Sequence, residues 1–303
     1  GHFGYLKIAE GCDKHCTYCI IPKLRGKFRS VPMERLIAQA EDMAEQGVKE
    51  LILVAQETTV YGKDLYGKKS LHILLKKLCE IRGIRWIRIL YCYPEEIYDE
   101  LIETIRDEKK ICHYLDIPIQ HASDRILKRM GRRTSKQELI DIVGKLRKEI
   151  PDIVLRTTLI TGFPGETEED HEELKEFVDE MEFDRLGVFT YSPEENTPAA
   201  EMADQVPEEV KEERRDELME LQQEISYDRG QDRIGQELLV MIEGKVADES
   251  AYIGRTYGDA PKVDGYIFVQ TGELLMTGDF AKVRVTGALE YDLIGVLSDE
   301  YTE

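Results

Sequence analysis

Three cysteines stand within eight positions near the start of the sequence, at Cys12, Cys16 and Cys19. A structural zinc site normally takes four ligands in two close pairs, whereas this spacing is C-x-x-x-C-x-x-C with no fourth cysteine nearby. Three thiolates in one loop suit a four-iron, four-sulfur cluster, in which one iron then has no protein ligand. That iron can bind a substrate or cofactor directly, so we predict that these cysteines hold one such cluster.

The other cysteines, Cys79, Cys92 and Cys112, lie in apolar helix or strand patterns and are interpreted as small core residues. Six cysteines in 303 residues are too few for a disulfide scaffold, so the triplet needs metal or redox chemistry. The sequence has no long apolar run and no signal peptide, which predicts a cytoplasmic protein without a membrane partner. It lacks an initiator Met, and we interpret it as a piece of a longer protein.

Short apolar segments alternate with amphipathic stretches from residue 1 to about residue 230. The predicted strands are Tyr5–Ala9, Leu51–Gln56, Trp86–Cys92, Tyr114–Gln120, Ile153–Thr161 and Leu186–Tyr191. Helix patterns fill the intervals, for example "PMERLIAQAEDMAEQG", with Pro32 at its start and Gly47 as its stop. Six alternations predict an α/β fold with a parallel sheet, either a βα barrel or a doubly wound sheet. In a βα barrel the chemistry lies at the carboxyl ends of the strands, and the cysteine loop follows the first strand.

The C-terminal part of the sequence has a different pattern. Residues 206–231 predict one long helix whose charged side chains form a solvated face. After Gly230 about five short strands are separated by glycines, which predicts a small antiparallel barrel of the OB type. We therefore expect a catalytic domain at residues 1–232 and a substrate-recognition barrel at residues 233–303.

The cysteine triplet, placed after the first strand of a six-fold βα pattern, resembles the radical S-adenosylmethionine (SAM) superfamily. The resemblance implies a partial, open βα barrel of about six parallel strands. It also implies that the free iron holds the amino and carboxylate groups of SAM, and that reduction of the cluster yields a 5′-deoxyadenosyl radical. Tyr18 resembles the aromatic position whose backbone lies near the adenine. The alternative is that Tyr18 only packs the loop.

Polar side chains follow several predicted strands, first among them Gln56, Glu57, Thr58 and Thr59. Gln56 joins Gln120, Ser123 and Arg156 in the predicted cofactor-binding set, because the active face of a parallel barrel lies at strand ends. Gln120 and Ser123 are expected to bond the ribose hydroxyls, and Arg156 to meet the SAM carboxylate. The alternative for Arg156 is an ion pair with a barrel carboxylate. His121 is interpreted as a satisfied hydrogen-bonding residue, and the catalytic residue is unknown.

Six segments together resemble the radical SAM methylthiotransferases: "EGCDKHCTYCIIPKLRGKFRS", "AQETTVYG", "YLDIPIQHAS", "TGFPGETEEDHEEL", "YSPEENTPAA" and "QVPEEVKEERRDELMELQQEIS". Within that family they look like the RimO branch, which modifies an aspartate of ribosomal protein twelve of the small subunit. The tRNA-modifying branch usually has an asparagine-rich segment in place of "QETTVYG", and it has "QSGS" in place of "QHAS". The C-terminal barrel resembles the TRAM domain of these enzymes.

The resemblance implies β-methylthiolation of that aspartate, with one SAM molecule as methyl donor and a second as radical source. A second [4Fe-4S] cluster, in an N-terminal domain, normally carries the sulfur. That domain is absent from this sequence, so we expect the radical half-reaction without complete sulfur insertion. The implied partners are the ribosomal protein, alone or within the subunit, and an electron donor such as flavodoxin or ferredoxin.

The charge balance supplies a separate prediction about the substrate. The chain has 41 basic and 61 acidic residues and a net charge of -20, and residues 231–303 hold 6 bases against 14 acids, which gives -8. Such a barrel should repel tRNA and attract a basic protein. Asp248, Glu249 and Asp259 are the acids chosen for a charge-reversal test. A basic group is interpreted as balancing local acids: Lys128, Arg129, Arg132, Arg133 and Lys136.

Two alternatives stay open at this point. One is a tRNA adenosine methylthiotransferase, which applies the same chemistry to a different substrate. The other is a nucleic-acid-binding module in which the cysteines hold zinc and the barrel binds RNA.

Overall fold

The computed structural model describes residues 1–298 and divides into two compact units. The first unit comprises Phe3–Leu221, and the second begins at Gln222. The second unit has its own core of apolar side chains, which includes Val240, Ile267 and Val283. Each unit therefore buries a core of its own.

The first unit is built on a six-stranded sheet with the order β1-β4-β5-β6-β7-β8. Its strands are β1 Phe3–Lys7, β4 Glu50–Val54, β5 Trp86–Ile89, β6 Ile111–Asp116, β7 Val154–Thr161 and β8 Arg185–Thr190. All neighbouring pairs are parallel, so the carboxyl ends of the strands meet at one edge. The six predicted strands and the open βα architecture are confirmed, with strand ends shifted by a few residues.

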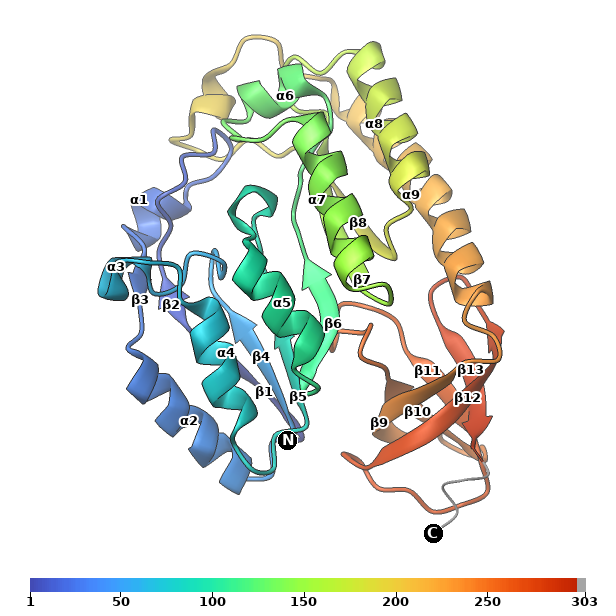
Figure 1. The fold of residues 1–303 in the computed structure, drawn as a ribbon. Coiled ribbons are helices and arrows are strands. Elements are labelled where there is room, and N and C mark those ends of the chain that lie inside the picture. The colour runs from blue at the N-terminus through green and yellow to red at the C-terminus, as the bar shows by residue number, and fades with distance from the viewer. Residues whose placement is uncertain (299–303) are drawn as a thin grey trace. The chain divides into compact units, whose positions relative to one another are not determined.

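Helices connect the strands and cover the sheet: α2 Met33–Glu45, α4 Leu71–Cys79, α5 Asp99–Asp107, α7 Lys136–Glu149 and α8 Glu168–Met181. Figure 1 shows α2, α4, α5 and α7 along the same side of the strands. Helix α2 turns Leu36 and Ala40 inward and begins directly after Pro32, as predicted. Helix α8 begins with a capping box in which Thr167 and Asp170 bond each other's backbone N–H groups. Helix position is therefore set by local sequence signals together with one buried face.

The second unit contains a closed barrel with the order β10-β11-β13-β12-β9. Its strands are β9 Glu237–Lys245, β10 Ala251–Arg255, β11 Ile267–Gln270, β12 Phe280–Ala288 and β13 Leu293–Leu297. Five strands were predicted, and five are found. The expectation of a wholly antiparallel barrel is wrong at one place, because β11 and β13 pair in parallel. The chain closes the barrel there by joining strands that do not follow each other in sequence.

The long charged helix is α9, Glu208–Gln231. The expectation that its charges only form a solvated face is wrong for two residues of the first unit. Lys211 Nζ lies 2.9 Å from the carbonyl oxygen of Tyr191, and Arg214 Nη1 lies 2.7 Å from Glu166 Oε1. Both side chains are buried, so this helix fastens loops of the first unit through hydrogen bonds.

No helix among residues 1–298 combines the length and the apolar character needed to cross a membrane.

Candidate active site at the cysteine loop

A short two-stranded ribbon holds the base of the cysteine loop. Strands β2 Ala9–Glu10 and β3 Arg29–Ser30 pair antiparallel on either side of it. Gly11 has φ +84, and a Cβ there would lie 2.2 Å from the carbonyl oxygen of Lys27, so only glycine fits. The next residue donates its backbone N–H to the carbonyl of Gly26 at 3.1 Å. The loop therefore starts from a fixed backbone position.

The three predicted cluster ligands all lie on this loop. Cys12 and Cys16 are buried, each 7% exposed, and Cys19 is half-buried. The N–H of Lys14 points to Cys12 Sγ at 3.4 Å, and the N–H of Cys19 donates to the carbonyl of Cys16 at 3.1 Å. Burial raises the pKa of Cys12 to about 11 and also raises that of Cys19. Without a metal these two thiols are neutral at pH 7, and metal binding has to displace their protons.

The three cysteine sulfur atoms do not all lie within 4.8 Å of one another in the structure. Across residues 1–298, the group of three His, Cys, Asp or Glu ligand atoms found within 4.8 Å of one another is His171, Glu172 and Glu217, on α8 and α9. The cysteine triplet is not such a group. A cluster with several irons gives each thiolate its own metal atom, whereas a structural zinc site takes four ligands, so three thiols on one loop suit a cluster better than zinc.

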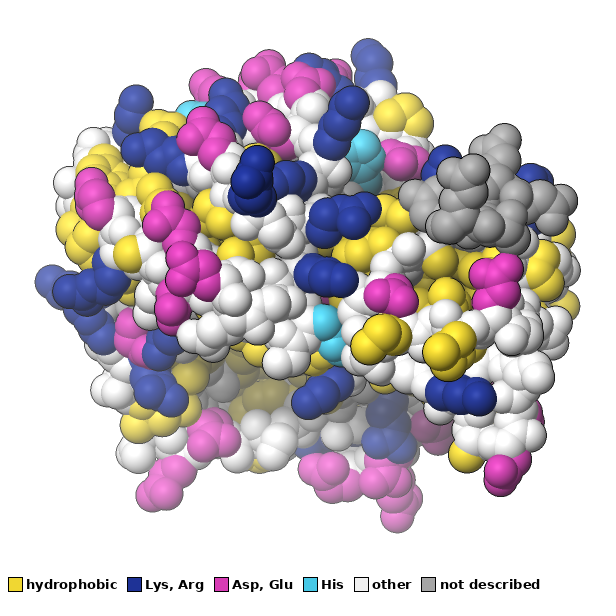
Figure 2. Space-filling model, turned by 90° about the horizontal axis from the view of Figure 1, so that it is seen from below, with side chains coloured by type: hydrophobic (Ala, Val, Ile, Leu, Met, Phe, Trp, Pro, Cys, Tyr) yellow, Lys and Arg dark blue, Asp and Glu magenta, His cyan; other side chains and the backbone are white. Residues whose placement is uncertain are grey.

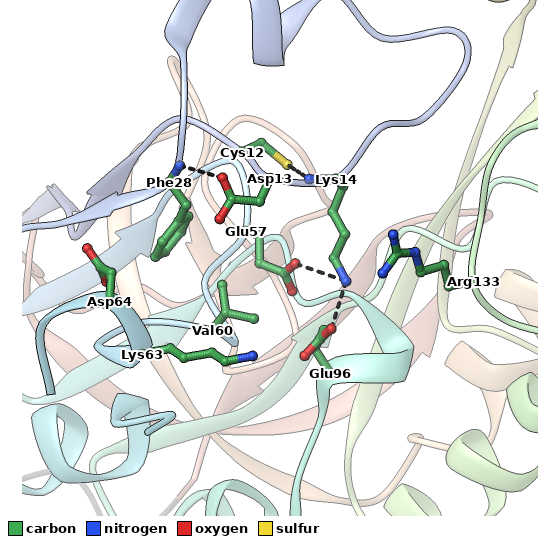
Figure 3. Close-up of a pocket in the computed structure, with 10 residues that line it drawn as sticks. All are labelled: Cys12, Asp13, Lys14, Phe28, Glu57, Val60, Lys63, Asp64, Glu96 and Arg133. Atoms are coloured by element: carbon green, nitrogen blue, oxygen red, sulfur yellow. Dashed lines mark hydrogen bonds and ion pairs between the residues drawn. The ribbon is translucent and has the colours of Figure 1, made fainter. Parts of the chain in front are cut away.

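A cavity of about 370 Å³ opens beside Cys12 (Figure 3). Charged side chains line much of it, among them Lys14, Glu57, Glu96 and Arg133. In Figure 3 the side chain of Lys14 points toward Glu57 and Glu96. Its Nζ lies 2.7 Å from Glu96 Oε1 and 4.0 Å from Glu57 Oε2. Neither Lys14 nor Glu96 was predicted as a site residue, because the two side chains meet only when the loop folds over the strand ends.

Glu57 follows β4 and is almost fully buried, with 1% of its surface exposed. Burial raises its pKa to about 7, because the hydrogen bond from Thr59 and the charge of Lys14 offset the lost hydration only in part. Glu57 thus changes its charge near neutral pH. It entered the sequence analysis only as one polar residue at a strand end.

Two members of the predicted cofactor set make hydrogen bonds within the protein. Gln56 Oε1 accepts the N–H of Gly11 at 3.0 Å, so Gln56 ties the cysteine loop to the end of β4. Ser123 is 2% exposed and donates its hydroxyl to Asp170 Oδ1 at 2.7 Å. It also stands immediately before α6, Asp124–Arg129. Their contacts with SAM stay predictions.

Gln120 and Arg156 are the other two members. Gln120 has φ +70 and continues the pairing beyond β6, since its N–H donates to Thr158 and its carbonyl accepts from Ile160. The Nε of Arg156, on β7, lies 3.5 Å from Asp116 Oδ1. The ion pair that was the alternative for Arg156 is therefore present, and its contact with a SAM carboxylate stays a prediction.

Tyr18 packs into a small aromatic cluster. Its ring meets that of Phe163 edge to face, with centroids 6.3 Å apart, and the Phe163 ring in turn contacts that of Tyr191. The packing alternative for Tyr18 is thus realised, and its proximity to an adenine stays a prediction.

His121 is satisfied, as expected. Its Nδ1 accepts the N–H groups of Ala122 and Ser123, each at 3.0 Å, so the ring carries its proton on Nε2 and donates to Glu166 Oε2 at 2.8 Å. The other oxygen of Glu166 accepts from the N–H of Gly162 at 3.0 Å and from Arg214. Burial opposes ionisation of Glu166, but these hydrogen bonds prevail and lower its pKa.

Comparison with known proteins identifies the family. Residues 6–178 match the radical SAM superfamily, and residues 234–297 match the TRAM domain. The ribosomal protein uS12 methylthiotransferase RimO of Lachnoclostridium phytofermentans is 68% identical over 295 residues, which are 97% of this chain and 67% of the relative. The chain belongs to the RimO family of radical SAM methylthiotransferases. The RimO of Clostridium perfringens is 56% identical over 296 residues, 98% of this chain and 66% of that relative.

This RimO-family chain spans about two-thirds of the length of the curated relatives that it matches. Solved structures of more distant proteins share the fold. Coproporphyrinogen III oxidase (HemN) from Escherichia coli, a radical SAM enzyme, aligns with a TM-score of 0.55 at 17% identity, covering 95% of this chain and 67% of HemN. The radical SAM methyltransferase TsrM from Kitasatospora setae also gives 0.55, at 16% identity, over 65% of this chain and 38% of TsrM.

The residues present fit the [4Fe-4S] cluster that the superfamily implies. The donor set is three thiols on one loop, and one of them, Cys12, lines a cavity. Cys79, Cys92 and Cys112 lie elsewhere in the fold, and the last two are buried, as predicted for core residues.

Proposed function

We propose that this chain binds SAM together with one [4Fe-4S] cluster and performs the radical half of the β-methylthiolation of an aspartate in ribosomal protein uS12. The observation that carries the proposal is a loop of three cysteine thiols beside a 370 Å³ cavity, in a chain 68% identical to a uS12 methylthiotransferase. When bound, the cluster supplies the electron that cleaves SAM.

The residues of this chain have distinct parts in the proposal. Cys12, Cys16 and Cys19 hold the cluster, and Gln56 keeps their loop against the strand ends through Gly11. Lys14 neutralises part of the acidic wall of the cavity, so an anionic group is not repelled there.

Tyr18, Gln120, Ser123 and Arg156 are proposed as SAM contacts. Gln120 follows the carboxyl end of β6, and Arg156, near the start of β7, lies opposite Asp116, the last residue of β6. A parallel βα fold keeps its ligands at the carboxyl ends of its strands. For Ser123 the proposal requires its hydroxyl to accept a bond while it donates to Asp170, which one hydroxyl can do. A second cluster as sulfur carrier, held by a region outside this chain, completes the proposal.

The charge of the barrel favours a basic protein substrate over tRNA. Exposed acids among residues 231–298 are Asp232, Glu237, Asp248, Glu249, Glu273 and Glu290. One prediction needs correction, because Asp259 is only 2% exposed and accepts hydrogen bonds from Thr256. Figure 2 shows Lys and Arg side chains among Asp and Glu side chains on the face in view, so the acids there do not form one continuous patch. The expected steering is therefore modest.

Radical SAM chemistry on a ribosomal protein also requires an electron donor and a compartment in which thiols stay reduced. We propose flavodoxin or ferredoxin as the electron donor and the cytoplasm as the compartment, where thiols stay reduced. The uS12 substrate is taken up alone or within the ribosomal subunit, and the TRAM barrel recognises it.

Mass spectrometry of uS12 tests the proposal. The full-length enzyme and this chain are each reconstituted anaerobically with iron and sulfide and incubated with SAM, a reductant and either uS12 or unmodified tRNA. We expect 5′-deoxyadenosine from both, and the mass of a methylthio group on one uS12 aspartate from the full-length enzyme. Modified tRNA and unmodified uS12 would support the tRNA alternative, and absence of 5′-deoxyadenosine from this chain would contradict the proposal.

A further inference from the structure

Arg132 is a buried arginine next to the cysteine loop. It is 6% exposed, and its Nη2 donates to the carbonyl of Pro118 at 2.7 Å. Its Nε and Nη1 are buried and have no hydrogen-bond partner in the protein. A buried guanidinium with two unused donors is costly, so the fold keeps this cation against a free-energy penalty.

The backbone around Arg132 is fastened to the cysteine loop between Cys16 and Cys19. The N–H and the hydroxyl of Thr17 donate to the carbonyls of Met130 and Arg129, both at 2.8 Å. Gly131 has φ +75, and a Cβ there would lie 2.9 Å from the carbonyl oxygen of His15. The position of the guanidinium is therefore tied to the position of the proposed cluster ligands.

Four groups face the guanidinium closely enough to interact with it electrostatically: Tyr18, Glu95, Tyr93 and Cys16. Its Cζ lies 4.5 Å from the centre of the Tyr93 ring. Glu95 is the one carboxylate among them. Its ion pair is with Lys14, whose Nζ lies 4.0 Å from Glu95 Oε1, and not with Arg132. The charge of Arg132 is thus only partly balanced by the protein.

We propose that Arg132 is a positioning residue for the [4Fe-4S] cluster, and that its charge and its two free donors stabilise the reduced state of that cluster. A cluster with three thiolate ligands carries a net negative charge that grows by one unit on reduction, and nearby charge and hydrogen bonds set its potential. A buried cation beside Cys16 favours the more negative state and so raises the potential. This inference rests on the proposed cluster site.

Redox titration of the reconstituted protein without SAM tests the role of Arg132. The variants are R132Q, which removes the charge, and R132K, which keeps the charge but loses the planar fork. K128Q, at an exposed position on α6, removes one charge without touching the loop and serves as the control. Iron and sulfide content, electron paramagnetic resonance and the midpoint potential are measured for each protein.

We expect R132Q to lower the ratio of reduced to oxidised cluster at a fixed potential about tenfold, which corresponds to about 59 mV for one electron. R132K should shift the potential in the same direction by less, and K128Q should match the unaltered protein. A cluster-loaded R132Q protein with an unshifted potential would overturn the inference. If R132Q fails to hold a cluster, an unshifted R132K would do the same.

The outcomes separate this inference from the proposed function. Unaltered protein that binds no iron and sulfide contradicts the cluster site, and the inference falls with it. Unaltered protein that binds a cluster, with variants of unchanged potential, contradicts only the role of Arg132.

Discussion

Two buried glutamates, each a few residues past the end of a strand, are treated differently by the fold. Glu166, beyond β7, receives hydrogen bonds from His121, Gly162 and Arg214, and its pKa is lowered. Glu57, beyond β4, has Thr59 as its hydrogen-bond donor and Lys14 at 4.0 Å, and burial raises its pKa to about 7.

The difference distinguishes Glu166, which belongs to the structural scaffold, from Glu57, which belongs to the candidate site. A carboxylate that the protein surrounds with donors is fixed in one charge state and fastens the elements around it. A buried carboxylate with few donors, next to a cavity, is left to respond to whatever binds. Glu57, the carboxylate with few donors, lines the cavity beside Cys12. Near the same cysteine loop, Arg132 also has two donors without a hydrogen-bond partner.

The largest expected effect comes from removing one proposed cluster ligand. We expect C16A to lose the cluster and with it reductive cleavage of SAM, because two thiolates do not replace three. Iron and sulfide content, visible absorption and 5′-deoxyadenosine are the readouts. C79A, at a half-buried thiol of α4, is the matched control and should keep all three. A full cluster in C16A would place the site elsewhere.

Changes in the hydrogen-bond network of Glu166 should lower the free energy of unfolding. R214M leaves the carboxylate of Glu166 buried without its cationic partner, so we expect a loss of about 3–5 kcal/mol in the free energy of unfolding. R215M, at the next residue, removes an arginine whose side chain is 38% exposed and should cost less than about 1 kcal/mol. Denaturant unfolding of the two variants decides the matter, and equal losses would contradict a structural role for the Glu166 network.

The contributions of the site and of the scaffold to the free energy of unfolding should also depend on pH with opposite signs. The folded pKa of Glu57 lies above its unfolded value, so its contribution to the stability of the cluster-free protein is lost as pH rises from about 4.5 to 7, by up to about 3 kcal/mol. E57Q should remove this fall. Unfolding measured across this pH range tests the prediction.

Asp170 supplies the matched control of opposite sign. Burial opposes ionisation, but hydrogen bonds from Arg125, Thr167 and Ser123 lower its pKa to about 2. Its contribution is present above pH 4 and is lost as pH falls toward 2, and D170N should remove that loss. An identical pH profile for E57Q and the unaltered protein would show that Glu57 ionises normally.

The smallest expected effect concerns the barrel. Reversing the exposed acids Asp248 and Glu249 to lysine should slow association with uS12 several-fold at low salt and little at high salt. K245E, which adds negative charge nearby at an exposed position, should act in the opposite direction. Stopped-flow association across ionic strength provides the measurement. Equal rates in all three proteins would leave the substrate preference to contacts other than charge.

The sequence was sufficient for the architecture because each element carries local signals. Strand and helix periods, Pro32 before α2 and the Thr167 cap of α8 all act within a few residues. The parallel β11–β13 pair was missed, since pairing between strands distant in sequence leaves no local mark. The cysteine triplet was visible because its ligands share one loop.

The remainder of the site depends on tertiary contacts that no spacing reveals. Lys14, Glu57 and Glu96 come from three separate segments, and only the folded loop brings them to one cavity. Arg132 was interpreted within a basic group that balances local acids. For Arg129 this holds, through an ion pair with Asp204, whereas Arg132 points inward with two donors unused.

Spectroscopy of the anaerobically reconstituted chain tests the central claim most directly, namely that the three-cysteine loop holds a cluster with an iron open to SAM. We predict about four iron and four sulfide per chain, and a paramagnetic resonance signal of the reduced protein that changes when SAM is added. A single bound zinc ion, or a four-iron signal that SAM leaves unaltered, would contradict the account.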